Sequence, residues 1–183
     1  MCSGQGGPYN NTSNTTPNSN QAGYGNIANC NTNHPQPNVA NLASTPRPAW
    51  FYFQIGQSGS IDLFLQQVRA DGTGIDVDFA LWGPFPSSNL LNMCNSLSGI
   101  DIDGNPANNY TGPCNLVDSS YSGLPTETIH FPNAVAGQFY LLLVTNFSGA
   151  AGTYTINQIN QTPSSGQISC DIVCGVNLGP DQL

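Results

Sequence analysis

Residues 49–85 constrain the fold more than any other part of this sequence. Every second residue of 61–65 and of 77–81 is apolar, and a Gly-Ser turn separates the apolar run at 49–56 from the next one at 60–68. A period of two is typical of a β-strand with one buried face, because successive side chains point to opposite sides of a sheet. This stretch therefore predicts paired antiparallel strands.

The whole chain is predicted to be all-β. The expected strands lie at about 49–56, 60–68, 75–82, 126–131, 138–146 and 152–159. Gly83-Pro84-Phe85-Pro86 should end the third strand, because proline has no amide hydrogen to donate. The unbroken apolar run at 139–144 is typical of a central strand buried on both faces. No helical period of useful length occurs, so we expect an antiparallel two-sheet β-sandwich, jelly-roll-like, with long disulfide-stapled loops.

The sequence divides into three predicted parts. Residues 1–48 are rich in Asn, Pro and Gly and are expected to pack on the sandwich, which occupies 49–160. Within it, 87–125 is a polar excursion longer than an ordinary loop, so it is functional or stapled. Residues 161–183 are expected to be a linker followed by the start of an Ig-like module.

The charge composition excludes two classes of partner. Only 7% of the residues are charged, the formal net charge is -8, and the sequence has no lysine. Binding nucleic acid or an anionic membrane surface requires clustered Lys or Arg, so neither is expected. No run approaches the ~20 apolar residues of a spanning helix, so direct membrane insertion is not expected either.

The cysteines point to an oxidising compartment. No CxxC pair of the kind typical of a zinc site occurs, and a chain of this composition fits an exported protein with disulfides. Proximity in sequence suggests that Cys2 pairs with Cys30 and Cys94 with Cys114, among the many connectivities that six cysteines allow. The six candidates are Cys2, Cys30, Cys94, Cys114, Cys170 and Cys174.

Two aspartates form the candidate metal site. Asp76 and Asp78 share one face of a predicted strand, about 6–7 Å apart between their Cα atoms, so both could reach one Ca²⁺ ion if a loop supplies further oxygens. The additional candidate ligands are Asp101, Asp103 and Asp118. An EF-hand is excluded, because Gly99 and Tyr110 would occupy positions that require carboxylates. The alternative is that these aspartates are solvated or bonded to the backbone.

Four aromatic side chains form a candidate glycan-binding platform: Trp50, Tyr52, Trp82 and Phe85. Each ring offers a large apolar face on which a sugar could stack. The alternative is that these rings belong to the core, which is where most strand aromatics lie.

Catalysis is not expected. His34 lies in a proline-rich segment and His130 in a predicted strand, and neither belongs to a local Ser-His-Asp or Cys-His motif. Glu127 is the only glutamate, so a catalytic carboxylate pair would have to include an aspartate.

The assembled motifs resemble a known family. Pro48-Ala49-Trp50-Phe51-Tyr52, Asp76-Val77-Asp78-Phe79 and Trp82-Gly83-Pro84-Phe85 are similar to the pre-peptidase-C-like β-sandwich domain of large secreted, gliding-motility-associated surface proteins of Bacteroidetes. Residues 117–122 and 127–148 continue the likeness, and 176–182 resemble the opening of the Ig-like repeats that often follow. The resemblance implies export by the type IX secretion system.

These observations predict a non-catalytic structural and adhesive module, extracellular or on the cell surface, with Ca²⁺ as its expected cofactor. Its expected partners are neighbouring Ig-like domains, other copies of itself in a filament, or surface glycans. The alternative is a carbohydrate-binding module of a secreted multidomain enzyme, and a hydrolase domain is the third hypothesis.

Overall fold

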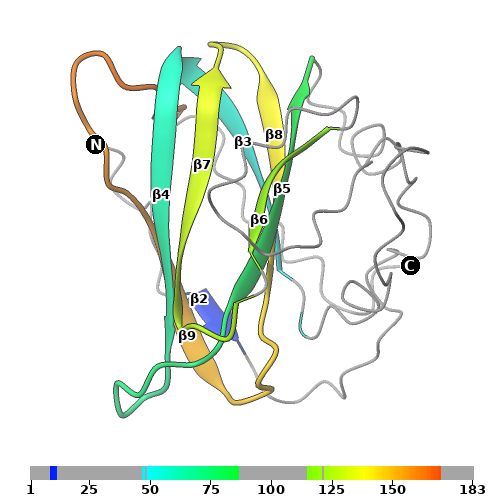
Figure 1. Cartoon of the computed structure of the whole chain (residues 1–183), viewed down its shortest axis with the longest axis vertical. Helices are drawn as coiled ribbons and strands as arrows, with labels where there is room; N and C mark the ends of the chain where they lie inside the picture. Colours follow the sequence, from blue (N-terminus) through cyan, green and yellow to red (C-terminus); the bar gives the residue numbers. More distant parts are fainter. Residues whose placement is uncertain (1–8, 12–46, 48, 87–114, 121, 170–183) are drawn as a thin grey trace.

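The protein folds into two antiparallel sheets that face each other (Figure 1). The structure is a computed structural model that describes residues 9–11, 47, 49–86, 115–120 and 122–169. Its strands are β2 (Tyr9–Asn11), β3 (Ala49–Gln57), β4 (Gly59–Val68), β5 (Asp78–Phe85), β6 (Leu116–Ser120), β7 (Thr126–Ala134), β8 (Phe139–Thr145), β9 (Gly152–Gln158) and β10 (Gln167–Ile168). No helix occurs among these residues. The predicted all-β fold with two antiparallel sheets is confirmed.

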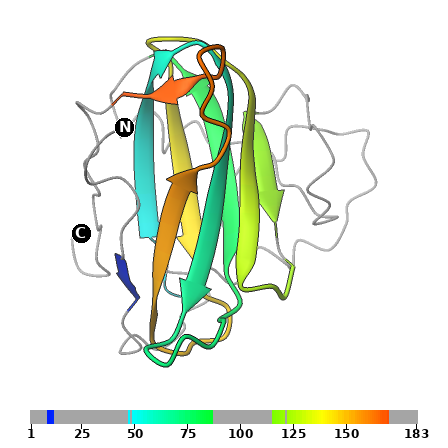
Figure 2. The ribbon, with the colours of Figure 1, turned by 90° about the vertical axis from the view of Figure 1, so that its left-hand side faces the viewer.

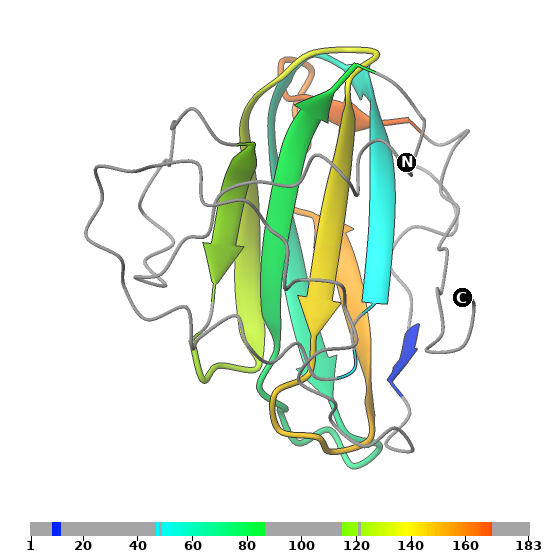
Figure 3. The same ribbon diagram turned by 90° about the vertical axis from the view of Figure 1, so that its right-hand side faces the viewer.

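The chain passes repeatedly from one sheet to the other. The five-stranded sheet has the order β10-β3-β8-β5-β6, and the four-stranded sheet has the order β2-β9-β4-β7. Every strand pairing is antiparallel. Figure 2 looks at the four-stranded sheet, and Figure 3 looks from the opposite side at the five-stranded sheet.

The core fills the space between the two sheets. Val77, Phe79 and Leu81, which the alternation predicted to be inside, are exposed by 0%, 1% and 0%. Phe131 joins the sheets through its ring, which meets Phe53 edge-on with centroids 6.2 Å apart and Tyr140 with centroids 5.0 Å apart. Such edge-to-face pairs add to the free energy gained from burial alone. The alternating pattern therefore identified the inward face correctly.

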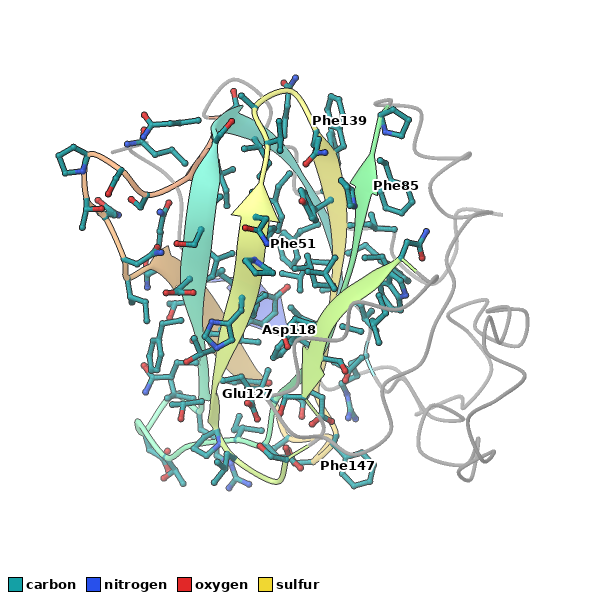
Figure 4. All side chains as sticks on the ribbon, turned by 45° about the horizontal axis from the view of Figure 1, so that its top comes forward. Phe51, Phe85, Asp118, Glu127, Phe139 and Phe147 are labelled. Carbon is teal, nitrogen blue, oxygen red and sulfur yellow. The ribbon has the colours of Figure 1, made fainter. Side chains whose placement is uncertain are left out.

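The five-stranded sheet is also buried on its outer face. β8 is buried at every position, which confirms the prediction for residues 139–144. The outward side chains of β5, β6 and β8 form a second apolar cluster of Ala80, Trp82, Phe85, Leu116, Phe139, Leu141 and Leu143. Phe85 and Phe139 are register partners at one end of this sheet (Figure 4).

The prediction that the third strand ends before Gly83 was wrong. β5 continues through Gly83 and Pro84 to Phe85, although these residues were expected to stop it. The pairing of β5 with β8 is irregular between Trp82 and Phe85, and the Gly83 amide donates instead to the Asn115 carbonyl at 2.8 Å. Proline is tolerated at such an irregularity because no ladder bond is required there.

Three short strands were not predicted. β2 lies in the segment 1–48, β6 in the polar excursion 87–125, and β10 in the stretch after residue 160. β2 pairs with β9 and β10 with β3, so each lies beside a longer strand. β2 and β10, with three and two residues, are too short to show a period of two, so their pairings depend on the long strands already being in place.

Two glycines fix the crossing from β9 to β10. Gly59 has a φ of +140°, and a Cβ added there would lie 2.4 Å from the Gly166 amide nitrogen. A Cβ on Gly166 would lie 2.5 Å from the Gly59 carbonyl oxygen. Only glycine permits two backbones to approach this closely, so the segment 159–166 lies tightly against the start of β4.

Candidate functional site

The candidate site surrounds the start of β5, where two connections meet. The Val77 amide donates to the Leu124 carbonyl at 3.1 Å, and the Ile75 amide donates to the Gln67 carbonyl at 3.0 Å. The Gln67 amide donates in turn to the Pro125 carbonyl at 2.9 Å. These bonds tie the β4–β5 and β6–β7 connections together at one end of the sandwich.

Asp76 and Asp78 flank Val77, whose side chain enters the core. Asp76 lies before the start of β5, so the strand alternation does not fix the direction of its side chain, and the shared face of the two aspartates stays a prediction. Asp78 is only 5% exposed, and Oδ1 of Asp76 is buried without a hydrogen-bond partner. Asp78 and one oxygen of Asp76 are therefore largely removed from solvent.

Glu127 adds a third carboxyl near this end of the sandwich, which the sequence analysis did not include in the metal site. Its position in the alternation of β7 places it on the inward face, and it is 7% exposed. Its Oε1 accepts a hydrogen bond from the Ser122 hydroxyl. The alternation of β7 was the signal that could have placed it, since Ile129 and Phe131 share its face.

The three carboxyls perturb one another. Burial raises the pKa of Asp78 to about 8, and the charges of Asp76 and Glu127 add to this effect. Burial also raises the pKa of Asp76 and that of Glu127, although hydrogen bonds from Ser122 and Ser120 oppose the shift in Glu127. None of the three forms an ion pair within the described ranges. Burial therefore disfavours the charged form of these carboxyls, and most strongly that of Asp78.

A buried amide lies nearby on the inward face. Gln67 is fully buried, and neither its Oε1 nor its Nε2 has a hydrogen-bond partner. The β4–β7 register pairs Leu65 with Glu127, so Gln67 lies diagonally across from Glu127 on the same face. Because Ile61, Leu63 and Leu65 precede it at a spacing of two, its inward direction was readable from the sequence.

Asp118 bonds to backbone amides. Its Oδ1 accepts from the Ser119 amide at 2.9 Å, and its Oδ2 accepts from the His130 amide at 2.6 Å. The second bond crosses from β6 to β7, which is an edge strand. An unpaired amide on an edge strand can pair with a strand of another chain. The Asp118 carboxylate occupies the His130 amide, and Pro132, two residues further along β7, has no amide hydrogen. Both features disfavour the addition of a strand at this edge. For Asp118 the structure matches the backbone-bonded alternative.

The remaining predicted ligands cannot be placed. Asp101, Asp103 and all six cysteines lie outside the described residues. Within the part that is described, no three His, Cys, Asp or Glu side chains come close enough to hold one metal ion. Asp76, Asp78 and Asp118 therefore do not form a complete site by themselves.

The aromatic candidates lie in the outer apolar cluster of the five-stranded sheet. Trp82 is 0% and Phe85 6% exposed, while Trp50 and Tyr52 are half-buried against them. The rings of Trp50 and Trp82 lie 6.0 Å apart and are tilted by 33°. As placed, these rings do not offer a flat open platform, and they match the core alternative.

His130 has an acidic partner on the four-stranded sheet. Its Nδ1 lies 2.8 Å from Oδ1 of Asp62, directly across the β4–β7 pairing. Both side chains are partly exposed on the outer face. This ion pair lies on the opposite side of its sheet from Glu127, so His130 does not join the buried carboxyls.

Comparison of the sequence with known protein families gave no match, and comparison with curated proteins gave none either. The resemblance to pre-peptidase-C-like domains therefore stays a prediction. None of the described residues forms a helix that could serve as a membrane span.

Proposed function

We propose that this chain is a non-catalytic structural and adhesive module of a large exported surface protein. The observation that carries the proposal is the organisation of the two sheets, with a filled core, a second apolar layer outside the five-stranded sheet and an edge closed by Asp118. A filled core and a second apolar layer are what a structural module requires to keep its shape. A jelly-roll-like sandwich with disulfide-stapled loops, as the sequence predicts, would serve the same purpose.

The resemblance to gliding-motility-associated domains supports export by the type IX system and a place beside Ig-like repeats. Assembly into filaments is the structural variant of the proposal. The closed edge of β7 favours contacts between faces over the addition of strands at that edge. Electron microscopy of the purified chain tests this variant, and monodisperse monomers at high concentration would count against it.

Ca²⁺ is the proposed stabiliser. Asp76 and Asp78 flank the buried Val77, Asp78 is almost fully buried, and Oδ1 of Asp76 has no hydrogen-bond partner in the described part. Oxygen ligands of this kind suit a hard cation, and extracellular modules bind Ca²⁺ at roughly 10⁻⁴–10⁻³ M. Asp101 and Asp103 are the candidates for completing the ligand set.

An exported scaffold should depend on its disulfides. We expect dithiothreitol to lower the melting temperature of protein folded under oxidising conditions, because losing one native disulfide costs about 2–5 kcal/mol in small secreted domains. Circular dichroism melts with reduced and with oxidised dithiothreitol make the comparison. Alkylation before reduction counts the free thiols, and we expect none. Six reactive thiols with an unchanged melting temperature would contradict the proposal.

The carbohydrate-binding module of a secreted enzyme remains the alternative hypothesis. Its predicted residues Trp50, Tyr52, Trp82 and Phe85 lie in a packed layer, so no observation at those positions favours it.

A further inference from the structure

In the described part, the outer face of the four-stranded sheet is accessible along three neighbouring strands. In β4, β7 and β9 the inward side chains are buried, while the outward ones are half-buried or exposed. Both faces of β5 and β8 are buried instead. Figure 2 shows β9, β4 and β7 side by side from this outer side. The four-stranded sheet therefore presents the broad accessible sheet face of the described part.

Phe64 lies at the centre of this face. It points outward from β4, between Thr128 of β7 and Asn157 of β9, its direct partners in the two pairings. Gln66 follows it on β4 beside Thr155. A half-buried aromatic ring surrounded by amide and hydroxyl groups combines an apolar surface with nearby hydrogen-bonding groups.

The polar groups around Phe64 are free to bind a ligand. The side chains of Gln66, Thr128, Thr155 and Asn157 make no hydrogen bond within the described ranges. By contrast, the crossing segment satisfies its own polar groups, as when the Ser165 hydroxyl donates to the Thr162 carbonyl at 2.8 Å. The face thus carries donors and acceptors that no contact between described residues uses.

A second apolar side chain extends the face beyond Phe64. The Ile159 amide donates to the Asp62 carbonyl at 2.9 Å, which places Ile159 directly beside Asp62 on the outer side. Its side chain is 57% exposed. Phe64 and Ile159 therefore lie on a diagonal across the two strands, with the Asp62–His130 ion pair at one end.

The charges of this face select the kind of ligand. Its acidic and basic groups are Asp62 and His130, which face each other at 2.8 Å, and the chain as a whole carries a net charge of -8. An acidic polymer would be repelled, and a basic one would find little negative charge at this place. A protein partner usually requires a larger apolar centre than one ring and one isoleucine supply.

We propose that the outer face of the four-stranded sheet, centred on Phe64, binds an uncharged glycan chain. The C–H side of a sugar ring would pack on Phe64, and its hydroxyls would exchange hydrogen bonds with Asn157, Thr128 and Gln66. This inference depends on the adhesive function proposed above, and it names the class of ligand. It replaces the four predicted aromatic positions with a different surface.

Affinity electrophoresis tests the proposal on the full chain. Native gels would contain hydroxyethylcellulose, laminarin, galactomannan or dextran, with alginate as the acidic comparison. We expect retardation by at least one neutral polymer and none by alginate. Phe64→Ala should weaken binding about tenfold, because a stacked aromatic contact contributes on the order of 1 kcal/mol or more, and Asn157→Ala should weaken it less.

The control is Phe147→Ala, which removes a 61% exposed aromatic ring from the turn after β8 (Figure 4) and should leave retardation unchanged. Asn157→Ala and Phe147→Ala should melt close to the wild type, since they alter exposed positions, and circular dichroism would confirm that Phe64→Ala, at a half-buried position, is folded at the temperature of the gel. Absence of retardation by every neutral polymer, or equal retardation of Phe64→Ala, would overturn the proposal. Sedimentation velocity would show whether the face pairs with a second copy, which would also overturn it. The thiol count and the melts in dithiothreitol do not depend on glycan binding, so failure of the glycan proposal can be distinguished from failure of the proposed structural function.

Discussion

Raising the pH from about 4 to about 8 in the presence of EDTA should lower the free energy of unfolding by on the order of 5 kcal/mol. The cause is Asp78, whose pKa rises from 3.8 to about 8 in the folded protein. The folded state keeps a proton that the unfolded state releases above 3.8. The stabilisation is therefore complete below that pH and is lost as the pH rises through 8. Because Asp78 is 5% exposed, solvent screens it little.

Guanidinium denaturation at a series of pH values measures this dependence. Asp78→Asn should flatten the curve, because an amide does not titrate, and should make the protein more stable than the wild type at pH 8. The matched control is Asp71→Asn, since Asp71 is exposed and its pKa is lowered by a hydrogen bond from the Thr73 amide. A wild-type slope in Asp78→Asn would disprove the assignment.

Replacing Phe131 with alanine should cost about 3–5 kcal/mol of unfolding free energy. Phe131 is 1% exposed, and its ring contacts both Phe53 and Tyr140 from the other sheet. Removing it deletes the buried ring surface and leaves a cavity that the two sheets cannot close without moving together. The melting temperature should fall by more than about 10 °C, as measured by circular dichroism.

Phe147→Ala provides the comparison for this substitution. Phe147 is 61% exposed, so the change should stay within about 0.5 kcal/mol. If both variants lost equal stability, or if Phe131→Ala cost less than about 1 kcal/mol, the proposed packing between the sheets would be incorrect.

The alternation of side chains made much of this fold predictable. Val77, Phe79 and Leu81 were placed inside correctly, because a strand allows only two faces and a core accepts only one of them. The apolar run at 139–144 likewise identified β8 as a strand buried on both faces. Local pattern suffices wherever a strand is long enough to repeat its period several times.

Features that depend on distant partners were not predictable. β2 and β10 are too short to show a period of two. β5 continues through Pro84 where the Gly83 amide donates to the carbonyl of Asn115, a residue distant in the sequence. The bond between Asp118 and the His130 amide likewise requires two strands from different sheets. Nothing within a few residues of Asp118 indicates it.

The candidate site was predictable only where its residues lie close together in the sequence. Asp76 and Asp78 were identified as a pair because they lie on one segment. Glu127 and Gln67 belong to other strands, and only the register of β4 and β7 brings them near this end. The position of Phe64 on an accessible face also required the sheet order, because an aromatic residue on the central strands β5 or β8 is buried.

The central claim is that this chain is an exported scaffold in which buried carboxyls are neutralised by Ca²⁺. Differential scanning calorimetry at pH 8, in EDTA and in millimolar Ca²⁺, tests it most directly. We expect Ca²⁺ at about 100 times its dissociation constant to raise the melting temperature of the wild type by about 5–10 °C. The melting temperature of Asp78→Asn, which lacks the proposed ligand, should stay unchanged. Equal melting temperatures of the wild type in the two buffers, with no heat on titration of Ca²⁺, would contradict it.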